Sequence, residues 1–293
     1  MPLRSIVKIE EVLAATVAQR ILVADCYIEA CETWTPVPWG WETRIDRRTI
    51  INVDHHAADQ RFFRHVSSGN LAMEYLAQHR QDPNTAVIIN HTDCDSVISS
   101  ALLCGLLDPK PSYAEAVIAA DHTGEPNAIA DLLQALDASR DYTGSLHNLW
   151  LLENNEPLEP NISLLLEDRQ RERTLATQLV NEGAFERFGR VAAATLPLEQ
   201  RVSGEFLPSL LKDAWAIVSG TPMANNRDRW ETKIRLGLNA PPGLSLFDLG
   251  VLEAEPCFGG RWNAGSTKRA GGSPVAPRQV ALCLASLIQR RAY

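Results

Sequence analysis

Four short apolar segments of this chain each end directly at an aspartate or a histidine. The segments are residues 21–24, 49–53, 85–90 and 113–120, and the residues that follow them are Asp25, Asp54, His91 and Asp121. A sheet of parallel strands brings the carboxyl ends of its strands to one edge, and α/β proteins build their sites there. The sequence therefore predicts an α/β fold with a site made of carboxylates and imidazoles.

Apolar residues at helical spacing alternate with these segments. Helices are predicted from Ile9 to about residue 17 and over residues 70–79 and 96–107, the last of them capped by Asp95 or Ser96. Strands that alternate with helices of about a dozen residues are typical of a mostly parallel sheet flanked by helices. Residues 26–48 contain several prolines and tryptophans, and this composition predicts an irregular loop.

The pattern changes beyond a long charged helix predicted over residues 163–181. Strands are then predicted at residues 191–196, 214–219 and 230–238, followed by a helix over residues 277–290. A chain of 293 residues is long enough for two domains. We therefore expect a metal-binding catalytic domain over residues 1–185 and a smaller α/β substrate-binding domain over residues 186–293.

Composition limits the function and the compartment. A net charge of −8 disfavours a general nucleic-acid coat protein, whose affinity would depend on a basic surface. The six cysteines form no CxxC pair, which disfavours a zinc knuckle or a disulfide framework and favours reduced thiols in the cytoplasm. No secretory signal and no run of roughly 20 apolar residues is found, so we expect a cytoplasmic protein without a membrane span.

Eight ligand-type side chains fall at the ends of the apolar segments. Crowded carboxylates repel one another unless cations neutralise them, so the set predicts two metal ions. Carboxylates and imidazoles without thiolates suit Mn²⁺, with Mg²⁺, Co²⁺ or Fe²⁺ as substitutes. The eight residues are Asp25, Asp54, His55, His56, His91, Asp93, Asp95 and Asp121.

These motifs resemble those of the DHH phosphoesterase superfamily, which includes single-strand exonucleases, oligoribonucleases, cyclic-dinucleotide phosphodiesterases and manganese-dependent pyrophosphatases. In that family one strand ends in His-x-x-x-Asp-x-Asp, a second in Asp, a third in Asp-His-His, and a fourth motif reads close to Asp-Thr-Gly. The corresponding stretches here begin at His91, Asp25, Asp54 and Asp121. The family's first motif stands third in this chain, which looks like a circular permutation of the catalytic domain.

The resemblance implies a role for each residue. Asp25 would bridge two ions; His91 and Asp93 would complete one site, and Asp95, His55 and Asp121 the other. Asp54 would orient its neighbours, and His56 would contact the scissile phosphoryl group. The reaction implied is hydrolysis of a phosphodiester in a short oligonucleotide or dinucleotide, by in-line attack of a hydroxide activated by the two ions.

A glycine-rich stretch near the carboxyl terminus resembles the substrate loop of the same family. Glycines let backbone amides approach a phosphate closely, and an arginine offers it a planar fork. The candidate substrate-binding residues are Gly259, Gly260, Arg261, Asn263, Gly265 and Ser266.

Three alternatives stay open at this point: a manganese-dependent inorganic pyrophosphatase, a non-catalytic nucleotide-sensing protein, and an α/β domain with coincidental acidic turns. The expected partner is a small phosphorylated substrate or a short single-stranded nucleic acid, with no membrane, and a homodimer is compatible with the sequence.

Overall fold

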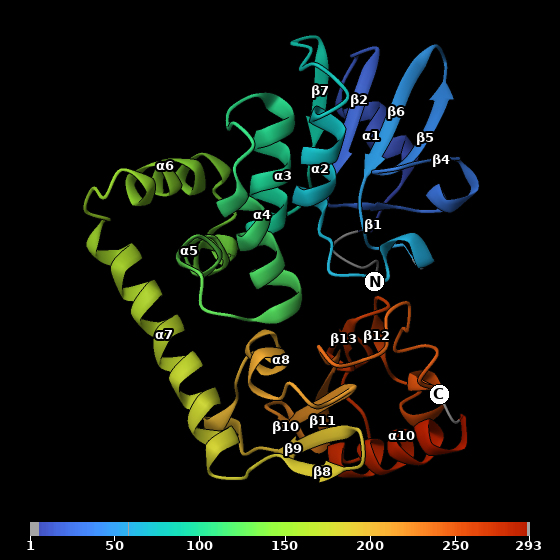
Figure 1. The fold of residues 1–293 in the computed structure, drawn as a ribbon, viewed down its shortest axis with the longest axis vertical. Helices are drawn as coiled ribbons and strands as arrows, with labels where there is room; N and C mark the ends of the chain where they lie inside the picture. The colour runs from blue at the N-terminus through green and yellow to red at the C-terminus, as the bar shows by residue number, and fades with distance from the viewer. Residues whose placement is uncertain (1–5, 58, 292–293) are drawn as a thin grey trace. The chain divides into compact units, whose positions relative to one another are not determined.

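The computed structural model describes residues 6–57 and 59–291, which form two compact units (Figure 1). The N-terminal unit takes in the chain up to Asp121 together with residues 126–169, and the C-terminal unit takes in residues 122–125 and the chain from Gln170 onward. The division lies at residue 169 and not near residue 185, because Ala176 and Leu179 of helix α7 (Pro160–Asn181) pack into a core of the C-terminal unit.

The N-terminal unit contains a five-stranded sheet whose centre is parallel. Strand β2 (Arg20–Ala24) lies between β6 (Arg48–Val53) and β7 (Thr85–Ile88) and pairs with both in parallel register. All three strands were expected from the sequence, and the predicted α/β architecture is confirmed. Because the three strands run in one direction, their carboxyl ends meet at the same edge of the sheet.

The other half of this sheet is antiparallel and corrects the prediction of a loop over residues 26–48. Strands β4 (Thr35–Val37) and β5 (Gly40–Ile45) extend the sheet beyond β6 in the order β4-β5-β6-β2-β7, so the sheet is mixed. The chain turns from β5 into β6 through Asp46 and Arg47, which both have positive φ, as tight hairpins require. Pro36 is accommodated because β4 is an edge strand.

Helices cover this sheet and place the loops after its strands. Helix α3 (Cys94–Cys104) follows β7 and lies beside α2 (Ser68–Leu76), as Figure 1 shows. It is capped by the side chain of Asp93, which accepts a hydrogen bond from the amide of Ser96. The predicted cap, Asp95 or Ser96, was therefore wrong by two or three positions. Besides α7, the described elements of this unit include β1 (Ile6–Val7), β3 (Tyr27–Ile28), α1 (Ile9–Ala15), α2 (Ser68–Leu76), α3 (Cys94–Cys104), α4 (Pro111–Ile118), α5 (Ala128–Leu136) and α6 (Tyr142–Glu153).

The C-terminal unit is built on a second mixed sheet, ordered β12-β13-β11-β10-β9-β8. Helix α10 (Pro277–Arg291) packs against β9 and β10, as Figure 1 shows in red. The three strands and the closing helix expected from the sequence are present. The other elements are β8 (Glu186–Phe188), β9 (Val191–Thr195), β10 (Ala216–Met223), β11 (Asn226–Leu236), β12 (Gly259–Gly260), β13 (Ala264–Ser266), α8 (Leu207–Leu210) and α9 (Val251–Ala254).

Within the part of the chain that the structure describes, no helix is at once long enough and apolar enough to cross a membrane.

Strand β5 approaches β6 closely at Gly40, and a substitution at this glycine measures how much that close approach contributes to stability. Its φ is +145°, and a Cβ atom there would lie 1.9 Å from the carbonyl oxygen of Asn52. We expect Gly40→Ala to lower the free energy of unfolding by about 3 kcal/mol, measured by urea denaturation, because strain and a backbone clash add.

The matched control is Gly243→Ala, which also has positive φ but places its Cβ more than 4 Å from any neighbour. Backbone strain alone should cost this variant about 1–2 kcal/mol. Equal losses of unfolding free energy in the two variants would show that the clash with the backbone of β6 adds nothing to the strain of the positive φ.

Candidate metal centre

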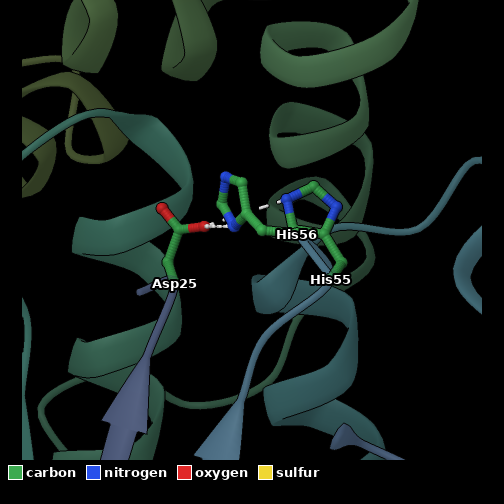
Figure 2. A group of neighbouring side chains, drawn as sticks. All are labelled: Asp25, His55 and His56. Carbon is green, nitrogen blue, oxygen red and sulfur yellow. Dashed lines mark ion pairs between the residues drawn. The ribbon is translucent and has the colours of Figure 1, made fainter. Parts of the chain in front are cut away.

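The candidate site lies where β2, β6 and β7 end. Asp25 directly follows β2, Asp54 follows β6, and the loop from His91 to Asp93 connects β7 to α3. Figure 2 shows the side chains of Asp25, His55 and His56 gathered at this edge. Asp121 joins them from a π-helical turn, Ala119–Thr123, that continues α4. Single π-helical turns are rare in proteins as a whole, and many of those that occur lie at functional sites.

Two groups of possible metal ligands share Asp25. One group joins Asp25 to His91 and Asp93, and the other joins it to His55 and His56; within each group the ligand atoms lie within 4.8 Å of one another. The Nε2 atom of His91 is 3.0 Å from Oδ2 of Asp25 and 3.3 Å from Oδ2 of Asp93. Oxygen and imidazole donors at this spacing fit divalent cations such as Mn²⁺.

Asp121 and Asp95 lie next to the second group, the one formed by Asp25, His55 and His56, because both carboxylates are close to the ring of His55. The Nε2 atom of His55 lies 3.0 Å from Oδ2 of Asp121 and 3.6 Å from Oδ2 of Asp95. Both oxygens of Asp95 accept backbone amides at the start of α2, from Ser68 and from Gly69, at 2.7 Å each. Asp95 is therefore held firmly by the helix, and it adjoins His55 without belonging to either ligand group.

Burial and mutual repulsion shift the pKa values of the clustered aspartates. Burial raises the pKa of Asp95 well above its ordinary value, and the charges of Asp25 and Asp121 raise it further. Desolvation and the charge of Asp25 likewise raise the pKa of Asp93. Burial alone would also raise the pKa of Asp25, but the hydrogen bond and the charge of His91 outweigh it and lower that pKa. A divalent cation would stabilise the ionised form of all three.

Hydrogen bonds orient each histidine of the cluster. The Nδ1 atom of His55 is 2.7 Å from the carbonyl oxygen of Val66, and Nδ1 of His91 is 2.6 Å from Oδ1 of Asn90. A hydrogen bond at Nδ1 leaves Nε2 as the ring atom that could ligate a metal, once a cation displaces any proton that Nε2 carries. In both rings the atom that faces the carboxylates is Nε2.

His56 is oriented differently from the other two histidines. Its Nδ1 lies 2.6 Å from Oδ1 of Asp54, and its backbone amide donates to Oδ2 of the same carboxylate. Asp54 is buried and contributes to neither ligand group. It is therefore in place to orient the ring of His56.

The backbone at Asp25 is held in an unusual conformation. Asp25 has φ +50°, in the left-handed region that few aspartates occupy. The buried amide of Asn52 donates to the carbonyl oxygens of Val23, at 3.3 Å, and of Cys26, at 2.8 Å, so it spans the turn that contains Asp25. Strained backbone of this kind persists only where its surroundings over-determine it.

Sequence reasoning missed the residues that hold Asp25. The hydroxyl groups of Ser96 and Ser68 donate to its two carboxylate oxygens, at 2.7 and 3.2 Å. The only sequence signal for Asn52 was a polar residue inside the apolar segment 49–53. Nothing in the sequence linked either serine to Asp25, because Ser68 in α2 and Ser96 in α3 come close to the end of β2 only in the folded chain.

The glycine-rich stretch forms a tight hairpin of β12 and β13 in the C-terminal unit. Gly260 pairs with Gly265, and a Cβ at Gly260 would lie 2.3 Å from the Cα of Gly265. A Cβ at Gly265 would lie 2.5 Å from the ring of Phe258. Close packing within the hairpin therefore accounts for glycine at both positions without a bound ligand. The six candidate residues of this stretch lie together in the hairpin and its turn.

Asn263, in the turn of this hairpin, contacts His122 within the same unit. Its Nδ2 atom lies 3.2 Å from Nδ1 of His122, and the ring of Trp262 lies near that of His122. His122 directly follows Asp121 in the chain. The sequence assigned no role to His122.

Comparisons with known proteins give little beyond the fold. No protein-family model matches the chain, and no curated protein matches it either. Among solved structures the chain is similar to the pGpG-specific phosphodiesterase PggH from Vibrio cholerae, with 9% sequence identity and a TM-score of 0.46 over 92% of this chain and 98% of that chain. A likeness at this level carries no functional argument, so the function must follow from the site.

Asn52→Ala tests whether the hydrogen bonds that hold the turn at Asp25 contribute to metal affinity. The variant removes both hydrogen bonds that span the turn, and we expect its affinity for Mn²⁺ to fall about tenfold or more, as is usual for groups that orient ligands. Isothermal titration calorimetry with MnCl₂ measures the change.

The control is Asn148→Ala, which removes another buried amide, bonded to the carbonyl oxygen of Gly144 in α6. Both variants should lose stability, by about 1–3 kcal/mol, but only Asn52→Ala should lose affinity for Mn²⁺. The same affinity in both variants would rule out a positioning role for Asn52.

Proposed function

We propose that this chain is a metal-dependent hydrolase that cleaves phosphodiester bonds in short oligonucleotides or dinucleotides. The observation that carries the proposal is the carboxylate of Asp25, which belongs to two separate groups of possible metal ligands. A carboxylate shared between two cations would hold them close together, as two-metal phosphoryl chemistry requires. Manganese is the ion that this donor set suits best, with Mg²⁺, Co²⁺ or Fe²⁺ as substitutes.

In this proposal some residues of the cluster bind the metal ions and others contact the phosphoryl group. Asp25, His91 and Asp93 would hold one ion, and Asp25, His55 and Asp121 would hold the other. Asp95, 3.6 Å from the Nε2 atom of His55, would join the second set only by exchanging one of its two amide hydrogen bonds for the ion. Divalent cations, when bound there, activate water and neutralise charge on the phosphoryl group. The Asp54 carboxylate fixes the ring of His56. The ring then donates a hydrogen bond to the phosphoryl group and stabilises its charge as the bond breaks.

Charge favours a short substrate. The chain has 28 lysines and arginines against 36 aspartates and glutamates, so a long polyanion would gain little from the protein as a whole. A dinucleotide needs only a local site. The predicted membership of the DHH superfamily and the predicted circular permutation remain part of this proposal, as do exonuclease action, a cytoplasmic location and a homodimer.

Asp25→Asn tests the enzyme directly. The amide cannot bridge two cations, so we expect hydrolysis of the dinucleotide pApA with Mn²⁺ to fall at least about 10³-fold, and bound manganese, measured by elemental analysis, to fall with it. Asp59→Asn is the control, because Asp59 pairs with Arg61 outside the cluster. EDTA should abolish the activity of the unmodified chain.

The same assay separates the alternatives. Faster turnover of pyrophosphate than of pApA would identify a pyrophosphatase. Binding of nucleotides with Mn²⁺ but no hydrolysis, unchanged in Asp25→Asn, would identify a sensing protein. No uptake of any divalent metal would leave only an α/β protein with acidic turns.

His56→Gln tests the division between metal binding and chemistry. If His56 acts on the phosphoryl group, kcat for pApA should fall about 10²- to 10⁴-fold, while affinity for Mn²⁺ and KM change little. Asp54→Asn should lower kcat in the same direction, because it releases the ring that Asp54 holds. A large loss of Mn²⁺ affinity in His56→Gln would instead make His56 a ligand, as its place in the second group allows.

A further inference from the structure

The chain passes from the N-terminal to the C-terminal unit directly after Asp121. Residues 122–125 belong to the C-terminal unit, although residues 126–169 return to the N-terminal one. The π-helical turn Ala119–Thr123 therefore crosses the boundary between the units. Peptide bonds join these residues whatever the arrangement of the two units, so contacts made by residues 122–125 act on the backbone of a candidate metal ligand.

Gly124, the residue after this turn, is fixed within the C-terminal unit. Its φ is +68°, and a Cβ atom there would lie 1.8 Å from the carbonyl oxygen of Glu205 and 2.9 Å from the Cα of Phe206. Only glycine permits so close an approach of two backbones. The carbonyl oxygen of Gly124 accepts hydrogen bonds from the guanidinium group of Arg173 and, at 3.4 Å, from the hydroxyl group of Ser209. The backbone that leaves the turn is thus both packed and hydrogen-bonded.

The guanidinium group of Arg173 is itself held in place. Arg173 comes from helix α7, is only 8% exposed, and places its Cζ atom 4.4 Å from the centroid of the ring of Phe206, which is fully buried. A planar guanidinium group that is stacked and buried loses little further freedom when it donates a hydrogen bond. A charged donor also bonds a carbonyl oxygen more strongly than a neutral one does. Arg173 is therefore a firm anchor for Gly124.

The direction of the Asp121 side chain depends on the geometry of the turn. A π-helical turn closes its hydrogen bonds over five residues, whereas an α-helical turn closes them over four. Relaxation to α-helical geometry would rotate Asp121 about the helix axis and move its carboxylate relative to the ring of His55, whose Nε2 atom lies 3.0 Å from Oδ2 of Asp121. An anchor at the end of the turn opposes this relaxation.

We propose that Arg173 is a positioning residue for the candidate metal centre, because by holding Gly124 it fixes the π-helical turn that carries Asp121. The inference rests on the proposed function in that it takes Asp121 to ligate one of two cations. The group formed by Asp25, His91 and Asp93 has no member in this turn. The C-terminal unit thus contributes, through the backbone alone, to the affinity for one ion and not for the other.

The experiment measures binding of Mn²⁺ by isothermal titration calorimetry and backbone order by hydrogen exchange. We expect Arg173→Met, which keeps an apolar side chain over Phe206 but loses the donor, to weaken binding of one of two Mn²⁺ ions about tenfold and to leave the other unchanged. In EDTA the amides of residues 119–123 should exchange faster than in the unmodified chain. Arg173→Lys should restore part of the lost affinity, because it restores a charged donor.

Arg229→Met is the matched control. Arg229 also donates to the carbonyl oxygens of glycines with positive φ in the C-terminal unit, Gly271 and Gly272, but it lies in β11. Its loss should change neither the affinity for Mn²⁺ nor the exchange of residues 119–123. Equal affinities for Mn²⁺ in Arg173→Met and Arg229→Met, or equal weakening of both ions in Arg173→Met, would overturn the proposal.

Thermal melting checks that each variant is folded. If Arg173→Met does not fold, Ser209→Ala replaces it, because Ser209 is the second donor to the carbonyl oxygen of Gly124. It should weaken binding of the same single ion by a smaller factor, and unchanged binding of both ions in this variant and in Arg173→Lys would count against the proposal.

Failure of this inference can be told apart from failure of the proposed function. If the chain hydrolyses no dinucleotide but Arg173→Met weakens binding of one Mn²⁺ ion, the positioning role stands and the phosphodiesterase proposal fails. If the chain hydrolyses pApA and Arg173→Met binds both ions normally, the positioning role fails and the phosphodiesterase proposal stands.

Discussion

Repulsion among buried carboxylates is the constraint on which the candidate site depends. Asp25, Asp95 and Asp121 are all buried, and the pKa of Asp95 is raised by burial and by the other two charges. In water such groups would separate, but here the parallel strands and the π-helical turn after α4 hold them together. A fold that keeps like charges together in this way is stabilised by any cation that enters between them.

The polar contacts around the cluster fix its geometry before a cation arrives. Asp25 is held by Asn52 through the backbone and by Ser96 and Ser68 through its oxygens. Carbonyl and carboxamide oxygens lie within hydrogen-bond distance of Nδ1 of His55 and of His91 and orient both rings. Preorganisation of this kind avoids the cost of ordering ligands when the metal binds, and it is why we expect a change at Asn52 to act on metal affinity.

Much of the parallel half of the sheet could be predicted, because apolar segments and their polar ends are local signals. The antiparallel half could not: prolines and tryptophans in residues 26–48 are typical of a loop, yet β4 tolerates Pro36 as an edge strand, and Trp39 and Trp41 fill the core. Asn52 and Ser68 were missed because the groups that they hydrogen-bond are remote from them in sequence, which no spacing pattern reveals.

The sequence by itself determined which residue types stand at the ends of the strands and hence the chemistry that the site can support. Period-two and period-3.6 patterns are written in neighbouring residues, so they determine strands and helices locally. Only the tertiary structure decided that Asp25 is shared between two groups of possible metal ligands, because that depends on the parallel register of β2 with β6 and β7. It also decided that the carboxylate of Asp54 lies within hydrogen-bond distance of the ring of His56.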